Sequence, residues 1–139
     1  MTSDASSLDQ AIVRQMAEAL IYANRDGVIE RWNPAAQAMF GFTAEEALGQ
    51  SLDLIIPERL RVAHWRGFRA AMASGKTRLH GRPTLTKALH KCGNKLYVEM
   101  SFALVVDDSG KAIGSVAVAR EVTERVAREQ AVGAGSPPR

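Results

Sequence analysis

The chain has 139 residues, of which 46% are hydrophobic and 24% charged, as is typical of one soluble globular domain. Its net charge of +3 is small, and the arginines are scattered, which argues against a nucleic-acid-binding surface. No apolar run approaches the ~20 residues of a membrane span, and no signal peptide is recognisable, so we expect a cytoplasmic protein. Cys92 is the only cysteine, which excludes an internal disulfide and a multi-thiolate metal site.

The N-terminal third predicts a helix followed by a β-hairpin. Residues 1–7 are small and polar, and we expect them to be disordered. Helically spaced apolar residues predict a flanking helix over 8–20, which would pack on a second copy of the chain or merely cap its own domain. Two strand-like runs, 19–24 and 28–32, are separated by a turn containing Asp26 and Gly27, a strong short-range hairpin signal.

Short helices and one longer helix are expected next. Asn33 and Pro34 would open a helix over 35–40, and Thr43 with Glu46 forms a capping box for another helix over 44–48. The longest helix is predicted for 57–75, because this stretch begins with a proline and ends with a glycine.

The long helix carries a histidine within an apolar stripe. Leu60, His64, Phe68 and Met72 fall on one face at helical spacing. Gly67 lies less than one turn after His64, and its missing side chain would make room for a flat guest molecule or for a neighbouring strand. By residue type, His64 is therefore either a ligand-binding residue or a buried histidine bonded to a carbonyl.

Three strands are predicted after the long helix. Pro83 limits the run 77–89 to an edge or bulged strand, the run 95–105 alternates cleanly, and the run 112–119 follows a turn. The apolar face of the alternating run consists of Leu96, Val98, Met100, Phe102 and Leu104.

The last part of the chain is expected to form a helix over 122–132 and a disordered tail over 133–139. The order of elements predicts an α+β fold, in which helices cover one face of a five-stranded antiparallel sheet. His64 of the long helix and Met100 of the alternating strand would then face each other.

Several landmarks resemble those of a PAS domain across residues 15–126. They are DGVIERWNPAAQAMFGFTAEEALGQ, IIPERLR, HKCGNKLYVEMSF and the closing VAREVTER. The resemblance implies a PAS sensor domain over 19–121, between an N-terminal flanking helix and a C-terminal signalling helix. It also implies a non-catalytic sensory role, a homodimer formed through the flanking helices, and an effector domain in a longer signalling protein.

Within this family, the chain is most similar to the haem-binding PAS sensors of oxygen-sensing histidine kinases. Their axial histidine follows the proline of a P-E-x-x-R segment by seven residues, as His64 follows Pro57. The resemblance therefore implies haem b, with His64 and Met100 as candidate iron ligands and a diatomic gas or the redox state as signal. Further cofactor contacts implied by position are Trp65, Phe68, Arg78 near a propionate, Leu79, Val98 and Phe102.

The family's distal arginine has no direct counterpart, because Thr84 occupies its position and Arg82 could replace it only if the strand is shifted. A non-haem metabolite, or a cavity filled by the protein's own side chains, stays open as an alternative, with dimerisation or protein interaction as the function. A flavin photoreceptor is disfavoured because its reactive-cysteine motif is missing from 49–61. A cone-shaped isomerase is disfavoured because Tyr97 and Glu99 alternate onto the outer face.

Overall fold

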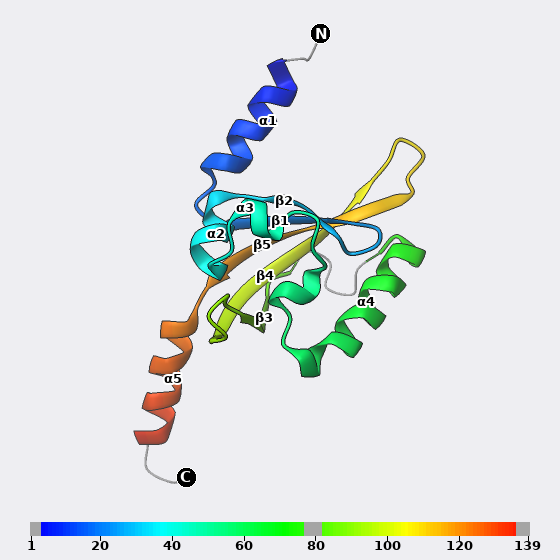
Figure 1. The fold of residues 1–139 in the computed structure, drawn as a ribbon. Helices are drawn as coiled ribbons and strands as arrows, with labels where there is room; N and C mark the ends of the chain where they lie inside the picture. Colours follow the sequence, from blue (N-terminus) through cyan, green and yellow to red (C-terminus); the bar gives the residue numbers. More distant parts are fainter. Residues whose placement is uncertain (1–3, 77–81, 136–139) are drawn as a thin grey trace.

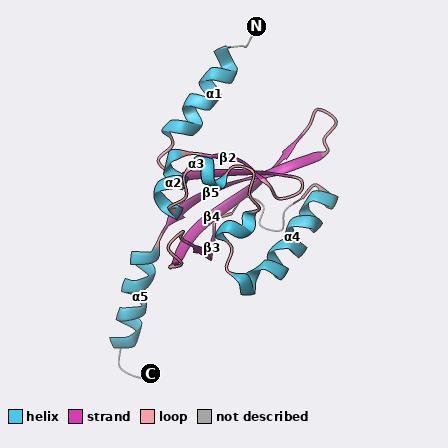
Figure 2. Ribbon diagram, in the orientation of Figure 1, coloured by secondary structure: helices cyan, strands magenta, loops and turns pink. Residues whose placement is uncertain are grey.

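A computed structural model describes residues 4–76 and 82–135. Helices lie on one face of a five-stranded antiparallel sheet with strand order β2-β1-β5-β4-β3, which confirms the predicted α+β class (Figures 1 and 2). The strands are β1 (Ala19–Asn24), β2 (Ile29–Trp32), β3 (Thr84–Leu89), β4 (Lys95–Val106) and β5 (Ala112–Glu121). The helices are α1 (Asp4–Gln15), α2 (Pro34–Phe40), α3 (Ala44–Ala47), α4 (Arg61–Ser74) and α5 (Thr123–Gly135), with 3-10 turns at Leu52–Ile55 and Glu58–Leu60.

The predicted hairpin forms between β1 and β2, and Gly27 is required in its turn for two reasons. Its φ is 80°, a left-handed conformation that residues with a side chain rarely adopt. A Cβ at this position would also collide with the ring of Trp65 on α4. The turn and the start of the long helix are therefore packed against each other.

The core lies between the sheet and the helices. The alternation along β4 is confirmed, since Leu96, Val98 and Met100 are buried on the face toward the helices. Phe40 of α2 is fully buried in the same hydrophobic cluster. The capping box at α3 is also as predicted, because Thr43 and Glu46 each accept a hydrogen bond from the other's backbone N–H.

The bounds of the flanking helices differ from the prediction. α1 begins at Asp4, so residues 4–7 are helical, and it ends at Gln15, several residues before the expected end at 20. At the other end of the chain α5 continues to Gly135, into the stretch expected to be a disordered tail. Both helices project away from the body of the domain, in opposite directions (Figure 1).

The segment around the long helix also differs in detail. It begins with the 3-10 turn Glu58–Leu60 and becomes α-helical at Arg61, while β3 begins only at Thr84, directly after Pro83. Pro83 lacks an N–H for the sheet ladder, which explains this start. In the described parts of the chain, we find no helix that is both long and apolar enough to cross a membrane.

Candidate functional site

His64 presents a buried nitrogen that has no partner. Its side chain is half-buried on α4, and its Nδ1 atom has no hydrogen-bond partner among the described residues. A buried polar atom without a partner costs about 1–3 kcal/mol, so such an atom in a native protein calls for an explanation. A bound ligand is one explanation that the site chemistry allows.

The surroundings of His64 favour its neutral form. Burial lowers the pKa of the His64 imidazole below its ordinary value, because the charged form loses hydration, and the nearby Asp53 carboxylate opposes this shift only in part. A neutral imidazole keeps a nitrogen lone pair, which a metal ion requires. His64 is thus chemically suited to hold iron.

Aromatic rings surround the imidazole on α4. The Trp65 ring meets the His64 ring edge to face, with centroids 4.6 Å apart, and the Phe68 ring lies at 5.9 Å. Trp65 is fixed at its other end, since its Nε1 donates a 2.7 Å hydrogen bond to Oδ1 of Asp53. Both aromatic residues pack against the main core cluster, so the predicted neighbours His64, Trp65 and Phe68 lie together.

Strand β4 contributes further apolar side chains to the same cluster. Val98 and Met100 of β4 are buried in the core, and Phe102 packs against the same cluster from a half-buried position. Thr84 is the cross-strand partner of Met100, so it shares that face. The apolar residues predicted for the cofactor on α4 and β4 therefore belong to one hydrophobic cluster.

Gly67 and Arg82 lie differently from Trp65 and Phe68, and two predicted residues lie outside the described part. Gly67 is exposed and a Cβ there would meet no protein atom within 4 Å, so its missing side chain does not make room for a neighbouring strand. Arg82 is exposed and precedes β3, so the strand is not shifted in the way that would let Arg82 replace the distal arginine. Arg78 and Leu79 fall in the segment that the structure does not describe.

Strand β4 is joined to both flanking segments by charged side chains, which the sequence did not reveal. Glu99, next to Met100, accepts hydrogen bonds from Arg120 at 2.8 Å and from Arg125 of α5 at 3.1 Å. These two bonds lower the pKa of the Glu99 carboxyl. Arg120 also pairs with Glu18, which lies between α1 and β1. These ion pairs therefore link both the segment after α1 and the helix α5 to the sheet.

Asn33 forms a second connection that the sequence revealed only in part. Its Oδ1 accepts hydrogen bonds from the backbone N–H groups of Leu20 and Ala36, each at 2.9 Å. Its Nδ2 donates to the carbonyl oxygens of Val13 and Glu18, at 2.9 and 3.1 Å. The predicted cap of α2 therefore also fixes the end of α1 to the sheet.

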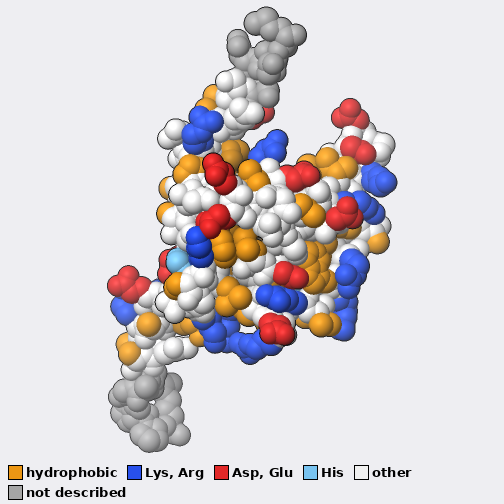
Figure 3. Space-filling view, in the orientation of Figure 1, with side chains coloured by type: hydrophobic (Ala, Val, Ile, Leu, Met, Phe, Trp, Pro, Cys, Tyr) orange, Lys and Arg blue, Asp and Glu red, His pale blue; other side chains and the backbone are white. Residues whose placement is uncertain are grey.

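The described residues offer little support for a multi-residue metal site, a reactive cysteine on the helices or a nucleic-acid interface. They contain no group of three or more His, Cys, Asp and Glu side chains that could hold a metal ion. Cys92 is exposed in the β3–β4 turn. Basic and acidic side chains are interspersed on the face drawn in Figure 3, unlike the basic patch of a nucleic-acid-binding protein.

Comparisons with known proteins agree with this arrangement. Residues 13–127 match the family described as PAS fold. Oxygen sensor protein DosP of Escherichia coli (strain K12) is 28% identical over 120 residues, which make up 86% of this chain and 15% of DosP. Sensor protein FixL of Bradyrhizobium diazoefficiens is 31% identical over 55 residues, 40% of this chain and 11% of FixL. The chain thus spans only a small part of these relatives.

Solved structures share the fold at low sequence identity. The PAS domain of a protein from Colwellia psychrerythraea superposes with a TM-score of 0.76 at 17% identity, covering 88% of this chain and 100% of that one. An RNA-binding Light-Oxygen-Voltage receptor superposes with a TM-score of 0.75 at 21% identity, covering 96% of this chain and 37% of the receptor. At such identities, the superpositions bear on the fold alone.

Proposed function

The chain belongs to the PAS family, and from that premise we propose that it is the sensory module of a longer, cytoplasmic signalling protein that binds haem b through His64. The observation that carries this proposal is the buried, unpartnered Nδ1 of a neutral imidazole on the helix that faces the sheet. The similarity to two relatives named as sensors, one of them an oxygen sensor, supports the choice of haem.

The chain's own residues would have distinct roles toward the cofactor. His64 would be one iron ligand, and the thioether of Met100 would be a second, since haem iron accepts both donor types. Trp65, Phe68, Val98 and Phe102 would exclude water from the apolar faces of the porphyrin. When bound, haem iron would supply the gas-binding or redox chemistry that the side chains lack.

Hemin titration tests the proposal. We expect purified protein to take up equimolar hemin with a Soret band, and His64→Ala to weaken hemin binding about tenfold or more and to shift the band. His90→Ala is the matched control, because His90 lies in the β3–β4 turn and should leave the titration unchanged. A folded protein without a Soret band at excess hemin would rule out the haem proposal.

A second candidate function is favoured by the packing of Trp65. Its ring closes over Gly27 and lies 5.3 Å from the Phe68 ring, so aromatic side chains already occupy space beside His64. On this basis the domain would hold a non-haem metabolite or only its own side chains, and would act in dimerisation. A featureless visible spectrum together with an intact dimer supports this candidate.

We also propose that the domain forms a homodimer through its flanking helices. Leu8 and Ile12 of α1 are 59% and 52% exposed and lie on the same side of the helix, an unpartnered apolar face.

The change at β4 caused by a ligand would reach α5 through Glu99 and its bonds to Arg120 and Arg125.

Ile12→Asp is expected to shift the protein toward monomer, because a carboxylate would be buried in an apolar interface without a partner. Sedimentation velocity at several concentrations measures the change. Val62→Asp is the matched control, since Val62 of α4 is 71% exposed and lies outside the flanking helices. An Ile12→Asp protein that remains as dimeric as the original chain would place the interface elsewhere.

A further inference from the structure

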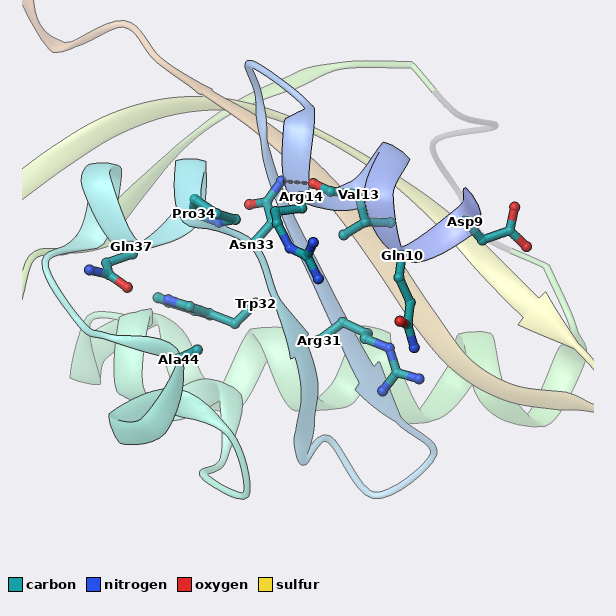
Figure 4. Close-up of a pocket in the computed structure, with 10 residues that line it drawn as sticks. All are labelled: Asp9, Gln10, Val13, Arg14, Arg31, Trp32, Asn33, Pro34, Gln37 and Ala44. Carbon is teal, nitrogen blue, oxygen red and sulfur yellow. Dashed lines mark hydrogen bonds between the residues drawn. The ribbon is translucent and has the colours of Figure 1, made fainter. Parts of the chain in front are cut away.

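A groove that shares no residue with the His64 site lies where α1 meets the domain (Figure 4). Its volume is about 560 Å³, within the range of small-molecule sites. Trp32 and Pro34 form part of its apolar lining together with Val13 of α1. The groove therefore offers an apolar surface to a ligand of moderate size.

Two arginines give this groove its charge. Arg14 comes from α1 and Arg31 from β2, and neither forms an ion pair in the described part of the chain. Arg31 donates one hydrogen bond, at 2.8 Å, to the backbone oxygen of Glu30, which leaves further N–H groups for a ligand. The lining includes one carboxylate, Asp9, which lies at the end of the groove away from Trp32 (Figure 4).

The dimer face of α1 does not coincide with the groove. With about 3.6 residues per turn, Gln10 lies roughly 160° and Val13 roughly 100–140° around the helix from Leu8 and Ile12, and Asp9 lies between the two groups. A second copy packed on the exposed apolar face would thus leave the groove open. The groove would accordingly stay available to a small ligand in the dimer proposed above.

From this combination of unpaired guanidinium groups and apolar lining, we propose that the groove binds an amphipathic monocarboxylate. The carboxylate would accept hydrogen bonds from Arg14 and Arg31, which match its planar geometry, and the apolar body would lie on Trp32 and Val13. The ligand would touch both α1 and the β2–α2 segment, which in the described part of the chain are joined by the hydrogen bond from Asn33 to Val13. Binding would therefore stabilise one orientation of α1 relative to the sheet.

Isothermal titration calorimetry with decanoate tests this site on the whole chain without added haem. We expect the original protein to bind decanoate, and we expect the double variant Arg14→Gln/Arg31→Gln to bind it at least about tenfold more weakly. Decanol, which has the same apolar body without the charge, should bind as weakly as decanoate binds to the double variant. Added salt should weaken binding of decanoate by the original protein, because the groove is exposed.

The matched control is Arg66→Gln/Arg128→Gln, which removes the same charge from exposed positions on α4 and α5 and should bind decanoate normally. Circular dichroism checks that each variant is folded. The proposal is overturned if the original chain does not bind decanoate, or if Arg14→Gln/Arg31→Gln or the alcohol gives equal affinity. Since no step involves haem, a failed hemin titration leaves this test and its result intact.

Discussion

Replacing Asn33 with alanine is expected to lower the free energy of unfolding by about 2–4 kcal/mol, because the change removes a helix cap and leaves buried backbone groups unpaired. Asn33 is only 3% exposed, so water cannot replace the lost bonds. The N–H groups of Leu20 and Ala36 would lose their acceptor, and the carbonyls of Val13 and Glu18 would lose their donor. Urea unfolding followed by circular dichroism measures the loss.

Thr43→Ala is the matched control for the Asn33 experiment. Thr43 also caps a helix, but it lies on the surface and bonds only within its own capping box, so its loss should cost about 1 kcal/mol. The difference between the two variants measures the long-range bonds of Asn33. Equal losses would mean that the bonds from Asn33 to the end of α1 contribute nothing to stability.

The Asn33 variant should also loosen α1. Hydrogen exchange at the last turn of α1 is expected to accelerate more than exchange in β4, because the two bonds that hold Val13 and Glu18 are lost. Asn33 is thus one connection between the end of α1 and the sheet, beside the ion pair of Glu18 with Arg120. The free energy of unfolding and the hydrogen-exchange rates together thus separate the effect of Asn33 on α1 from its effect on the core.

Replacing Phe40 with alanine is expected to cost about 3–5 kcal/mol, the largest effect we predict, because it opens a cavity in a close-packed core. The Phe40 side chain is fully buried, and its ring centroid lies 5.5 Å from that of Trp32. A chain of this size has a total stability of about 5–15 kcal/mol, so the variant should unfold at much lower urea concentration. The same urea titration provides the measurement.

Leu48→Ala is the control for the Phe40 experiment, since Leu48 follows α3 directly and is 43% exposed. We expect its loss to stay within about 1 kcal/mol, because surface substitutions remove few contacts. Phe40→Leu should fall between the two alanine variants, as it retains most of the buried volume. If Phe40→Ala costs no more than Leu48→Ala, α2 is not packed as the structure has it.

Much of the fold could be predicted because its signals are local. The turn at Gly27, the capping box at Thr43 and Glu46, and the alternation along β4 each depend on residues at most a few positions apart. Such patterns act through the backbone conformation and the side-chain periodicity of a single element. The landmarks that resemble the PAS family consist of these same turns, caps and alternating strands, which is why the family could be recognised from sequence.

The end of α1 could not be predicted in the same way. Apolar residues continue at helical spacing past Gln15, so periodicity alone extends the helix toward residue 20. The chain instead pairs Ala19 with Ala119 of β5, and Asn33, which lies 20 residues from Val13, bonds to the carbonyls near the helix end. Partners so distant in sequence outweigh a weak local preference.

The sequence by itself determined that this chain forms an antiparallel sheet covered by helices, and that His64 lies on the apolar side of the longest helix. Only the tertiary structure decided that Gly67 faces outward, that Trp65 closes over Gly27, and that Arg14 and Arg31 line the same groove as Trp32. The physical reason is range: local conformation is set by neighbours along the chain. The surroundings of a side chain are set by segments that meet only when the core packs.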